Sequence, residues 1–199
     1  MTRLIYLSLK AFFRALEYGR GIRLAFFILI CGGQCKGIPK VGKAVTWKYP
    51  PHSGIAIGSR CDIGPGCLID APPTAQLTIG ANVKLTAGII ISCANHVEIG
   101  DDTLIAEYSC IRDSQHKYFS DHLIRAQPLQ LGTITIGKDV WIGRASSILL
   151  NTHLADGCVI GAQSLLKNYR TEPNSVYVGN PARIIKMRVP HQCDEFTES

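Results

Sequence analysis

The sequence repeats with a period of six residues. An aliphatic residue recurs at every sixth position in four runs that insertions separate: Ile57, Ile63, Ile69; Ile79, Leu85, Ile91; Ile99, Ile105, Ile111; and Ile136, Ile142, Ile148, Leu154, Ile160, Leu166. An amphipathic helix needs a period near 3.6 and a half-buried strand a period of two, so neither explains this spacing. A six-residue unit cannot bury its own aliphatic side chain, and successive units must therefore stack.

A second position of the repeat supports stacking. Small or β-branched residues stand two positions before the aliphatic residue: Cys61, Cys67, Val83, Val97, Thr103, Ser109, Val140, Ser146, Thr152, Cys158 and Ser164. Strand positions two apart point to the same side, so both series face one interior. Glycine often follows the aliphatic residue, where we expect it to permit a tight corner. Three units per triangular turn then predict about five coils and a height of roughly 24 Å.

This pattern resembles the hexapeptide-repeat acyltransferases. The segment Ile134–Gly143 (ITIGKDVWIG) and the segment Val178–Arg183 (VGNPAR) are similar to specific parts of that family's signature. The resemblance implies an all-β, left-handed parallel β-helix over residues 51–185, preceded by a basic, partly helical flank at 1–50 and followed by a tail at 186–199. It also implies a homotrimer with sites between neighbouring chains.

The longest break in the repeat predicts a functional loop at residues 112–133. Loops of this length inside a regular fold are usually functional, and this one contains His116. Acetyl transfer to a hydroxyl needs a base for the hydroxyl proton, which suits an imidazole, and direct attack needs no enzyme nucleophile. The resemblance places the catalytic histidine of galactoside and colanic-acid-type O-acetyltransferases at His116. Asp113, three residues earlier, is a candidate to orient the imidazole.

Other polar residues near this break remain candidates. Asp121 and His122 are alternative catalytic groups, and His96 is a candidate for the acceptor site. Three histidines also raise the alternative of a zinc site like that of gamma-type carbonic anhydrases, which share this fold. Their spacing does not resemble that family's, so no metal is expected.

The resemblance implies acetyl-CoA as the acetyl donor, bound in a groove between neighbouring prisms near the later coils. An aromatic side chain would pack near the thioester, backbone groups at two corners would bind the amides of the pantetheine arm, and two cations would approach the phosphates. The matching positions, in that order, are Trp141, then Gly143, Arg144, Gly161 and Ala162, then Lys167 and Arg183.

Positive charge gathers at the N-terminal end. The net charge is +6, yet residues 1–60 contain ten Lys or Arg and one acidic residue, which gives +9 there and −3 in the rest. Residues 3–31 combine these cations with large apolar side chains, as one or two amphipathic helices would. Such a helix would pack on a neighbouring subunit or contact an anionic membrane surface. The longest apolar run, residues 24–31, is too short to span a bilayer, and no nucleic-acid-binding motif is present.

The N-terminal flank, residues 1–50, also indicates which class of acceptor to expect. It has no room for the βαβ nucleotide-binding unit of relatives that acetylate nucleotide-linked amino sugars, nor for the long helical domain of serine acetyltransferases. We therefore expect O-acetyl transfer to a sugar or a surface-polysaccharide precursor. N-acetyl transfer to an amino sugar, a serine-type activity and a non-catalytic binding protein are the alternatives. Eight cysteines without a CxxC pair indicate reduced thiols, and hence a cytoplasmic location, with the inner membrane face as a possible contact.

Overall fold

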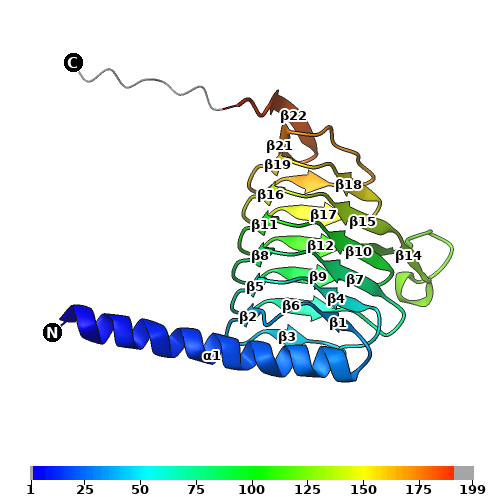
Figure 1. Cartoon of the computed structure of the whole chain (residues 1–199). Helices are drawn as coiled ribbons and strands as arrows, with labels where there is room; N and C mark the ends of the chain where they lie inside the picture. Colours follow the sequence, from blue (N-terminus) through cyan, green and yellow to red (C-terminus); the bar gives the residue numbers. More distant parts are fainter. Residues whose placement is uncertain (1, 191–199) are drawn as a thin grey trace, which may run out of the picture.

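The computed structural model describes residues 2–190 and contains one long helix followed by a parallel β-solenoid (Figure 1). The helix α1 (Thr2–Ile30) precedes three parallel sheets that form the faces of a triangular prism. The tail predicted at 186–199 lies mostly outside the described residues.

Each face collects one strand from every coil. The first face contains β1 (Gln34–Cys35), β4 (Ile55–Ile57), β7 (Gln76–Ile79), β10 (His96–Ile99), β15 (Thr133–Ile136) and β18 (Thr152–Leu154). The second contains β2 (Lys40–Val41), β5 (Asp62–Ile63), β8 (Lys84–Leu85), β11 (Leu104–Ile105), β16 (Trp141–Ile142), β19 (Val159–Ile160), β21 (Ser175–Gly179) and β22 (Ala182–Met187). The third contains β3 (Thr46–Trp47), β6 (Leu68–Asp70), β9 (Ile90–Ser92), β12 (Cys110–Arg112), β17 (Ser147–Leu149) and β20 (Leu165–Leu166).

The solenoid has one more coil than the five that we expected. Strands β1, β2 and β3 pair in parallel with β4, β5 and β6, and they form a first coil within residues 34–47. Its inward positions, Cys35, Val41 and Trp47, keep the six-residue spacing. Two of them are not aliphatic, so a search for aliphatic repeats passes over this coil.

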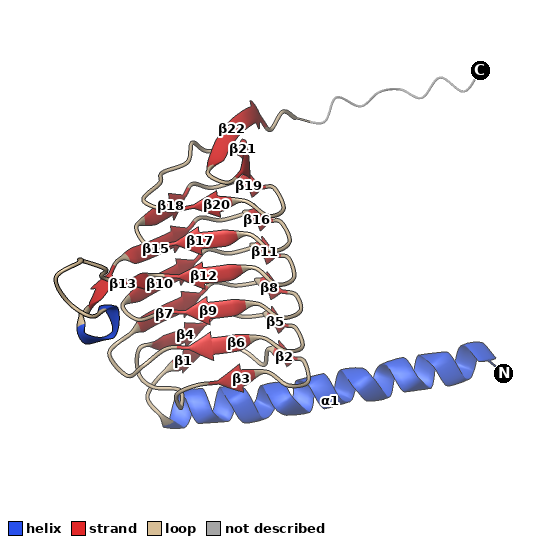
Figure 2. Ribbon diagram, turned by 180° about the vertical axis from the view of Figure 1, so that it is seen from behind, coloured by secondary structure: helices blue, strands red, loops and turns tan. Residues whose placement is uncertain are grey.

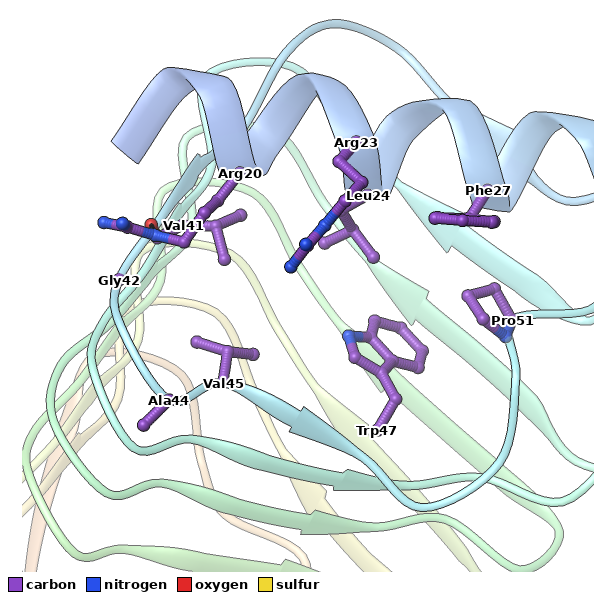
Figure 3. Close-up of a pocket in the computed structure, with 10 residues that line it drawn as sticks. All are labelled: Arg20, Arg23, Leu24, Phe27, Val41, Gly42, Ala44, Val45, Trp47 and Pro51. Atoms are coloured by element: carbon purple, nitrogen blue, oxygen red, sulfur yellow. Dashed lines mark hydrogen bonds between the residues drawn. The ribbon is translucent and has the colours of Figure 1, made fainter. Parts of the chain in front are cut away.

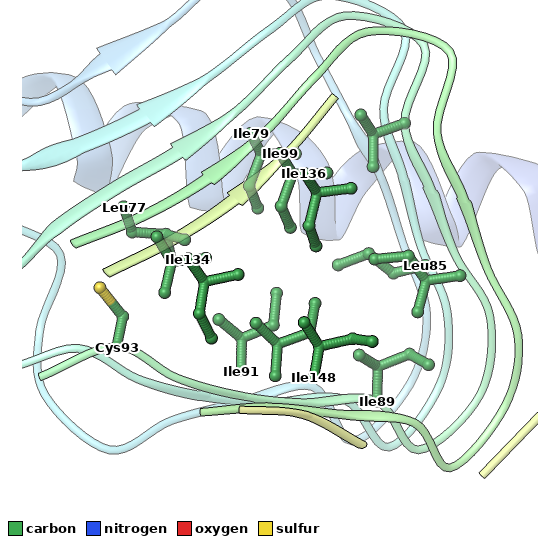
Figure 4. Close-up of a cluster of buried hydrophobic side chains, with 14 of the residues drawn as sticks. Leu77, Ile79, Leu85, Ile89, Ile91, Cys93, Ile99, Ile134, Ile136 and Ile148 are labelled. Atoms are coloured by element: carbon green, nitrogen blue, oxygen red, sulfur yellow. The ribbon is translucent and has the colours of Figure 1, made fainter. Parts of the chain in front are cut away.

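The core confirms the repeat (Figure 4). All fifteen aliphatic positions of the four runs are at most 1% exposed, and the small residues two positions earlier are buried as well. Three of the hydroxyls at the small positions, those of Thr103, Ser109 and Ser146, donate to a backbone carbonyl of the next coil. The hydroxyl of Thr103 donates to Gly137 O at 3.0 Å, and that of Ser109 donates to Gly143 O at 3.0 Å. A buried polar atom is tolerated there because it has a partner.

The glycines that follow the aliphatic residues serve close packing rather than the corner itself. None of Gly58, Gly100 and Gly143 has a positive φ, whereas corner residues such as Asn82 and Asp102 do. A Cβ at Gly58 would lie 2.5 Å from Ala81 N, and a Cβ at Gly143 would lie 2.6 Å from Ala162 N. The expected reason for glycine is therefore wrong: coils approach too closely here for any side chain.

Both ends of the prism are covered. The hairpin of β21 and β22 closes one end, and α1 lies across the other, against the first coil. Leu24, Ala25 and Ile28 are the buried apolar residues of α1 and lie on one side of it. Within the described residues, no helix combines the length and apolar character needed to cross a membrane.

The predicted loop leaves the prism as a hairpin, which we call the arm (residues 112–133; Figure 2). It contains β13 (Ser114–His116), a short 3-10 helix η1 (Ile124–Ala126) and β14 (Leu129–Leu131). Because β10 pairs directly with β15, the first face continues without interruption beneath the arm. The arm therefore projects from an unbroken frame at the corner between the third and first faces.

Candidate active site

His116 lies beside a polar cavity at the base of the arm. It is the last residue of β13, it is exposed, and it is paired with Leu129 of β14. The cavity has a volume of about 560 Å³. Polar side chains from four successive coils and the arm line it: Lys48, Asp70, Ser92, Arg112, Gln115 and His116.

The arm is braced internally around His116 and is tied to the prism next to it. Antiparallel pairing of β13 with β14 sets the backbone, and Gln115 Nε2 donates to Gln130 Oε1 at 2.8 Å. The ammonium of Lys167, at the end of the last coil, donates to Gln115 Oε1. The ammonium of Lys167 thus ties the arm to the prism, and its predicted approach to the phosphates of CoA stays a prediction.

Asp113 is fully buried and shapes the backbone beneath the cavity. Its two carboxylate oxygens accept hydrogen bonds from the N–H groups of Ala94, Asn95 and His96 at 2.7, 2.7 and 2.8 Å. Among residues 2–190, no hydrogen bond joins it to His116. In this chain the Asp113 carboxylate holds the 94–96 turn, and its predicted part in orienting the imidazole of His116 stays a prediction.

A column of polar side chains leads along the third face to His116. Asp70, Ser92 and Arg112 are neighbours in register on three successive coils, and Lys48 lies one coil below Asp70. Lys48 Nζ is 3.0 Å from Asp70 Oδ2, and this hydrogen bond and charge raise the pKa of Lys48. The six-residue repeat gives no signal for this column, because the repeat marks inward-facing positions and these residues stand at outward ones. Alternating donors and acceptors of this kind suit a ligand rich in hydroxyl groups.

The other candidate histidines lie elsewhere. His122 Nδ1 is 2.9 Å from Asp121, and both side chains are about two-thirds exposed on the outer part of the arm. His96 Nε2 is 4.0 Å from Glu98 on the first face. The cavity is lined by none of the alternative candidates His96, Asp121 and His122. Within residues 2–190, no three His, Cys, Asp or Glu side chains gather closely enough to hold a metal ion.

Trp141 lies on a different face from His116. It belongs to β16 on the second face, its side chain is 54% exposed, and its neighbours in register are Leu104 and Val159. Figures 1 and 2, seen from opposite directions, both place β16 and the arm on opposite sides of the prism. One chain therefore does not bring Trp141 and His116 together.

In each predicted corner pair, Gly143–Arg144 and Gly161–Ala162, one backbone N–H bonds within the prism and the other is available to a ligand. Gly143 N donates to Ile160 O and Gly161 N donates to Tyr177 O, so both N–H groups serve the coils. The N–H groups of Arg144 and Ala162 have no backbone acceptor in the described part of the chain. Of the four predicted positions, Arg144 and Ala162 are thus the ones that can donate to an amide of a bound ligand.

Tyr108 and Glu107 complete the corner beside Arg144. The guanidinium of Arg144 lies 5.6 Å from the centre of the Tyr108 ring, and its Nε is 3.1 Å from Glu107. Tyr108 is 61% exposed and has a φ of 61°, a conformation uncommon for an aromatic residue. Neither residue was predicted from the sequence. Their only signal is that Tyr108 occupies the corner position at which the two preceding coils have Gly66 and Gly88. Arg183, in β22, donates to Ala182 O and leaves most of its guanidinium free.

Sequence comparisons match this chain to acetyltransferases. Residues 133–164 match a family model described as the hexapeptide repeat of succinyl-transferase. The chain is 31% identical to the putative lipopolysaccharide biosynthesis O-acetyl transferase WbbJ of Escherichia coli, over 66% of this chain and 71% of that protein. It is 31% identical to the galactoside O-acetyltransferase of Escherichia coli, over 77% of this chain and 82% of that protein.

Two further likenesses are more limited. A probable acetyltransferase of Mycobacterium tuberculosis is 31% identical over 77% of this chain, but the match spans only 51% of that longer protein. Among solved structures, the Bacillus cereus N-acyltransferase AntD, in complex with dTDP and coenzyme A, superposes with a TM-score of 0.69. At 22% identity over 79% of this chain and 84% of AntD, that likeness shows the fold.

Proposed function

The chain belongs to the hexapeptide-repeat acetyltransferases, and from this premise we propose that it transfers an acetyl group from acetyl-CoA to a hydroxyl of a sugar. The observation that carries the proposal is the position of His116. A hairpin braced by two strands and by Lys167 holds this imidazole beside a cavity lined with polar side chains. WbbJ and the galactoside O-acetyltransferase, which match over 71 and 82% of their own lengths, are both named O-acetyltransferases.

The proposed reaction is direct attack with His116 as general base. The imidazole accepts the hydroxyl proton as the sugar oxygen attacks the thioester carbonyl, and the C–S bond then breaks. The imidazolium returns the proton to the departing sulfur, so the products are an acetyl ester and the free thiol of CoA. Holding both substrates together supplies much of the acceleration, and no enzyme nucleophile is used.

We propose that each site combines two chains. Among the groups expected to bind CoA, Trp141 belongs to β16, which lies on the opposite side of the prism from the arm of the same chain, and Arg144 and Ala162 stand at the corners that follow β16 and β19. A cyclic trimer about an axis parallel to the prism would bring the arm of one chain to the second face of the next. The apolar strip of Leu104 and Trp141 is exposed in one chain, as a face awaiting a ligand or a neighbour would be.

The acceptor class follows from the relatives and the cavity. WbbJ is named for lipopolysaccharide biosynthesis, and the polar column from Lys48 to Arg112 would bind several hydroxyl groups of a surface-polysaccharide precursor. Transfer to the amine of an amino sugar is the second candidate, because AntD is an N-acyltransferase with the same fold. The higher identity to the two O-acetyltransferases favours the hydroxyl.

Acetyl-CoA and a panel of sugars and oligosaccharides, followed by mass detection of an added acetyl group, test this function. We expect a product whose acetyl group is removed by mild alkali, as an ester is. An alkali-stable product would show amide formation and would replace the hydroxyl acceptor by an amine. A panel without any acetylated product, when the galactoside enzyme acetylates its sugar in parallel, would contradict the proposal.

We also propose that α1 contacts a membrane from the base of the prism. Its residues Phe12, Ile22, Phe26 and Ile30 lie on the side opposite the buried Ile28 and are 54 to 67% exposed. Since α1 lies across the base, this side faces away from the coils (Figure 1). In a trimer whose axis follows the prism, three such faces would share one plane, which suits a bilayer better than a neighbouring prism.

A further inference from the structure

A second cavity lies between α1 and the first coil (Figure 3). Its volume is about 300 Å³. From α1, the side chain of Arg23 reaches toward Trp47 of the first coil, and Phe27 lies above Pro51, whereas the guanidinium of Arg20 is turned toward Val41 at the edge of the cavity. No residue of this cavity belongs to the proposed acetyl-transfer machinery.

The polar side chains that line this cavity, Arg20, Arg23 and Trp47, are all hydrogen-bond donors. Trp47 Nε1 is buried and has no hydrogen-bond partner, and an indole N–H can only donate. Figure 3 shows this nitrogen on the side of the ring nearer the guanidinium of Arg23. Arg20 uses Nε to hold Val41 O at 2.7 Å, and no carboxylate among residues 2–190 forms a salt bridge with either arginine. A buried donor beside the guanidinium of Arg23, which has no acidic partner, lacks an anion.

The remaining walls are apolar. Leu24, Phe27, Val45 and Pro51 surround the donors. An anion that also carries a hydrocarbon chain satisfies both parts of this lining, whereas a free inorganic anion would leave the apolar walls in contact with water. The outward face of α1, defined above by Phe12, Ile22, Phe26 and Ile30, borders the same end of the prism.

We propose that this cavity binds the phosphate group of an anionic membrane lipid, with the guanidinium of Arg23 and the indole N–H of Trp47 as donors and the guanidinium of Arg20 as a second positive charge in the lining. The lipid tail then lies along the apolar wall toward the membrane-facing side of α1. Arginine suits this task because its planar fork pairs with two phosphate oxygens at once.

One segment of the first coil lines both this cavity and the one beside His116, and this gives the site its role. Trp47 and Pro51 line the lipid cavity, while Lys48 and Tyr49, between them in sequence, line the His116 cavity. From the coil of Lys48 to that of Arg112 the polar column rises three coils, or about 14 Å at roughly 4.8 Å per coil. A sugar chain attached to the bound phosphate would extend along this column to His116. This role rests on the proposed function, because it makes the lipid the carrier of the acceptor.

The chain offers a direct probe of this cavity, because Trp47 and Trp141 are its only tryptophans. In full-length Trp141→Phe protein, the fluorescence comes from Trp47 alone. We expect dihexanoyl phosphatidic acid, below the concentration at which it forms micelles, to change this fluorescence to saturation. Arg23→Gln in the same background should weaken the midpoint about tenfold, the loss of one charge-assisted hydrogen bond.

The control variant is Arg14→Gln, which removes an equal charge from α1 outside this cavity and should leave the midpoint unchanged. Inorganic phosphate or dihexanoyl phosphatidylcholine with the same midpoint as the phosphatidic acid would overturn the assignment to an anionic lipid. So would equal midpoints for Arg23→Gln and its parent. No fluorescence response at all, as expected if a second copy of the chain fills the cavity, would overturn it too.

The lipid site and the acetyl-transfer site fail independently. His116→Ala in the Trp141→Phe background should bind dihexanoyl phosphatidic acid like its parent, since His116 does not line this cavity. If wild-type chains acetylate a free sugar but do not bind the lipid, the lipid proposal alone is wrong. Lipid binding without any acetyl transfer would remove the proposed function alone.

Discussion

The prism interior and the surface of α1 contain similar side chains with opposite exposure. The aliphatic residues of the repeat are at most 1% exposed, whereas Phe12, Phe26 and Ile30 of α1 are 58, 58 and 67% exposed. The interior is complete within one chain, because each coil covers the next. The helix exposes large apolar side chains to water, and this exposure does not stabilise a single chain. We therefore infer that another surface covers it.

The same contrast separates the frame from the working parts. The strands of successive coils pair in a defined register, which fixes the backbone of the prism. The arm and α1 project from this frame. The groups proposed for catalysis and for membrane contact lie on these projections or on outward strand positions. Perturbing the interior should therefore change stability, and perturbing the projections should change activity or binding.

The largest expected effect is on catalysis. His116→Ala should lower kcat for acetyl transfer by roughly 10² to 10⁴-fold, because the hydroxyl proton loses its base. His122→Ala, on the outer part of the same arm, is the matched control and should retain near wild-type turnover. Steady-state assays with thiol detection measure both. A fully active His116→Ala enzyme with an unchanged circular-dichroism spectrum would show that another group is the base.

The interior can be tested by adjacent residues of β11. Ile105→Ala should lower the free energy of unfolding by about 2 to 5 kcal/mol, because Ile105 is fully buried and a cavity remains. Leu104 is 47% exposed, so Leu104→Ala should cost about 0.5 kcal/mol or less. Urea unfolding of the two variants gives the comparison. Equal losses would mean that Leu104 is covered in the assembled protein.

Membrane contact should change by a smaller factor. Phe12→Glu places a charge in the outward face of α1 and should reduce partitioning onto vesicles of phosphatidylglycerol and phosphatidylcholine by at least about tenfold. Tyr118→Glu alters an aromatic residue on the arm that is 71% exposed, against 58% for Phe12, and should leave partitioning as it is. Flotation of the full chains measures both. Identical recovery of wild type and Phe12→Glu in the vesicle fraction would assign this face to another partner.

The smallest effect concerns alkaline stability. Burial, with the nearby Asp113 carboxylate, raises the pKa of the Cys93 thiol to about 12, and burial also raises the pKa of Cys61 and Cys67. The folded chain thus keeps protons that the unfolded chain releases above about pH 9. Stability from these thiols is complete below that pH and is lost as the pH rises toward 12.

Cys93→Ala should therefore lose less stability than wild type between about pH 8 and about pH 10, a window that contains the ordinary thiol pKa. Urea midpoints at the two pH values measure the difference. A wild-type slope that the substitution leaves unchanged would show that the Cys93 thiol contributes nothing to the alkaline loss.

The frame was predictable because the repeat is a local pattern. Each position such as Ile105 or Ser109 has its own sequence signal, and stacking follows from the inability of one unit to bury it. The first coil was missed because Cys35 and Trp47 replace aliphatic residues. The reason for glycine was wrong at positions such as Gly143, because contact between coils is a property of the stack and not of one corner.

The site was predictable only in part. The long break located His116, but the hydrogen bonds of Asp113 and Lys167 depend on residues 17 to 52 positions away and leave no local signal. The polar column was hidden for a similar reason, since Lys48, Asp70 and Arg112 belong to different coils and meet only when the coils stack.

The central claim is that His116 of one chain acts on an acetyl group held against Trp141 of the next. Mixing inactive His116→Ala and Trp141→Ala chains, with unfolding and reassembly, tests it most directly. Random cyclic trimers would contain one intact pair in each mixed trimer, so we expect roughly a quarter of wild-type activity to return. Activity no greater than that of the two variants assayed separately would contradict a site shared between chains.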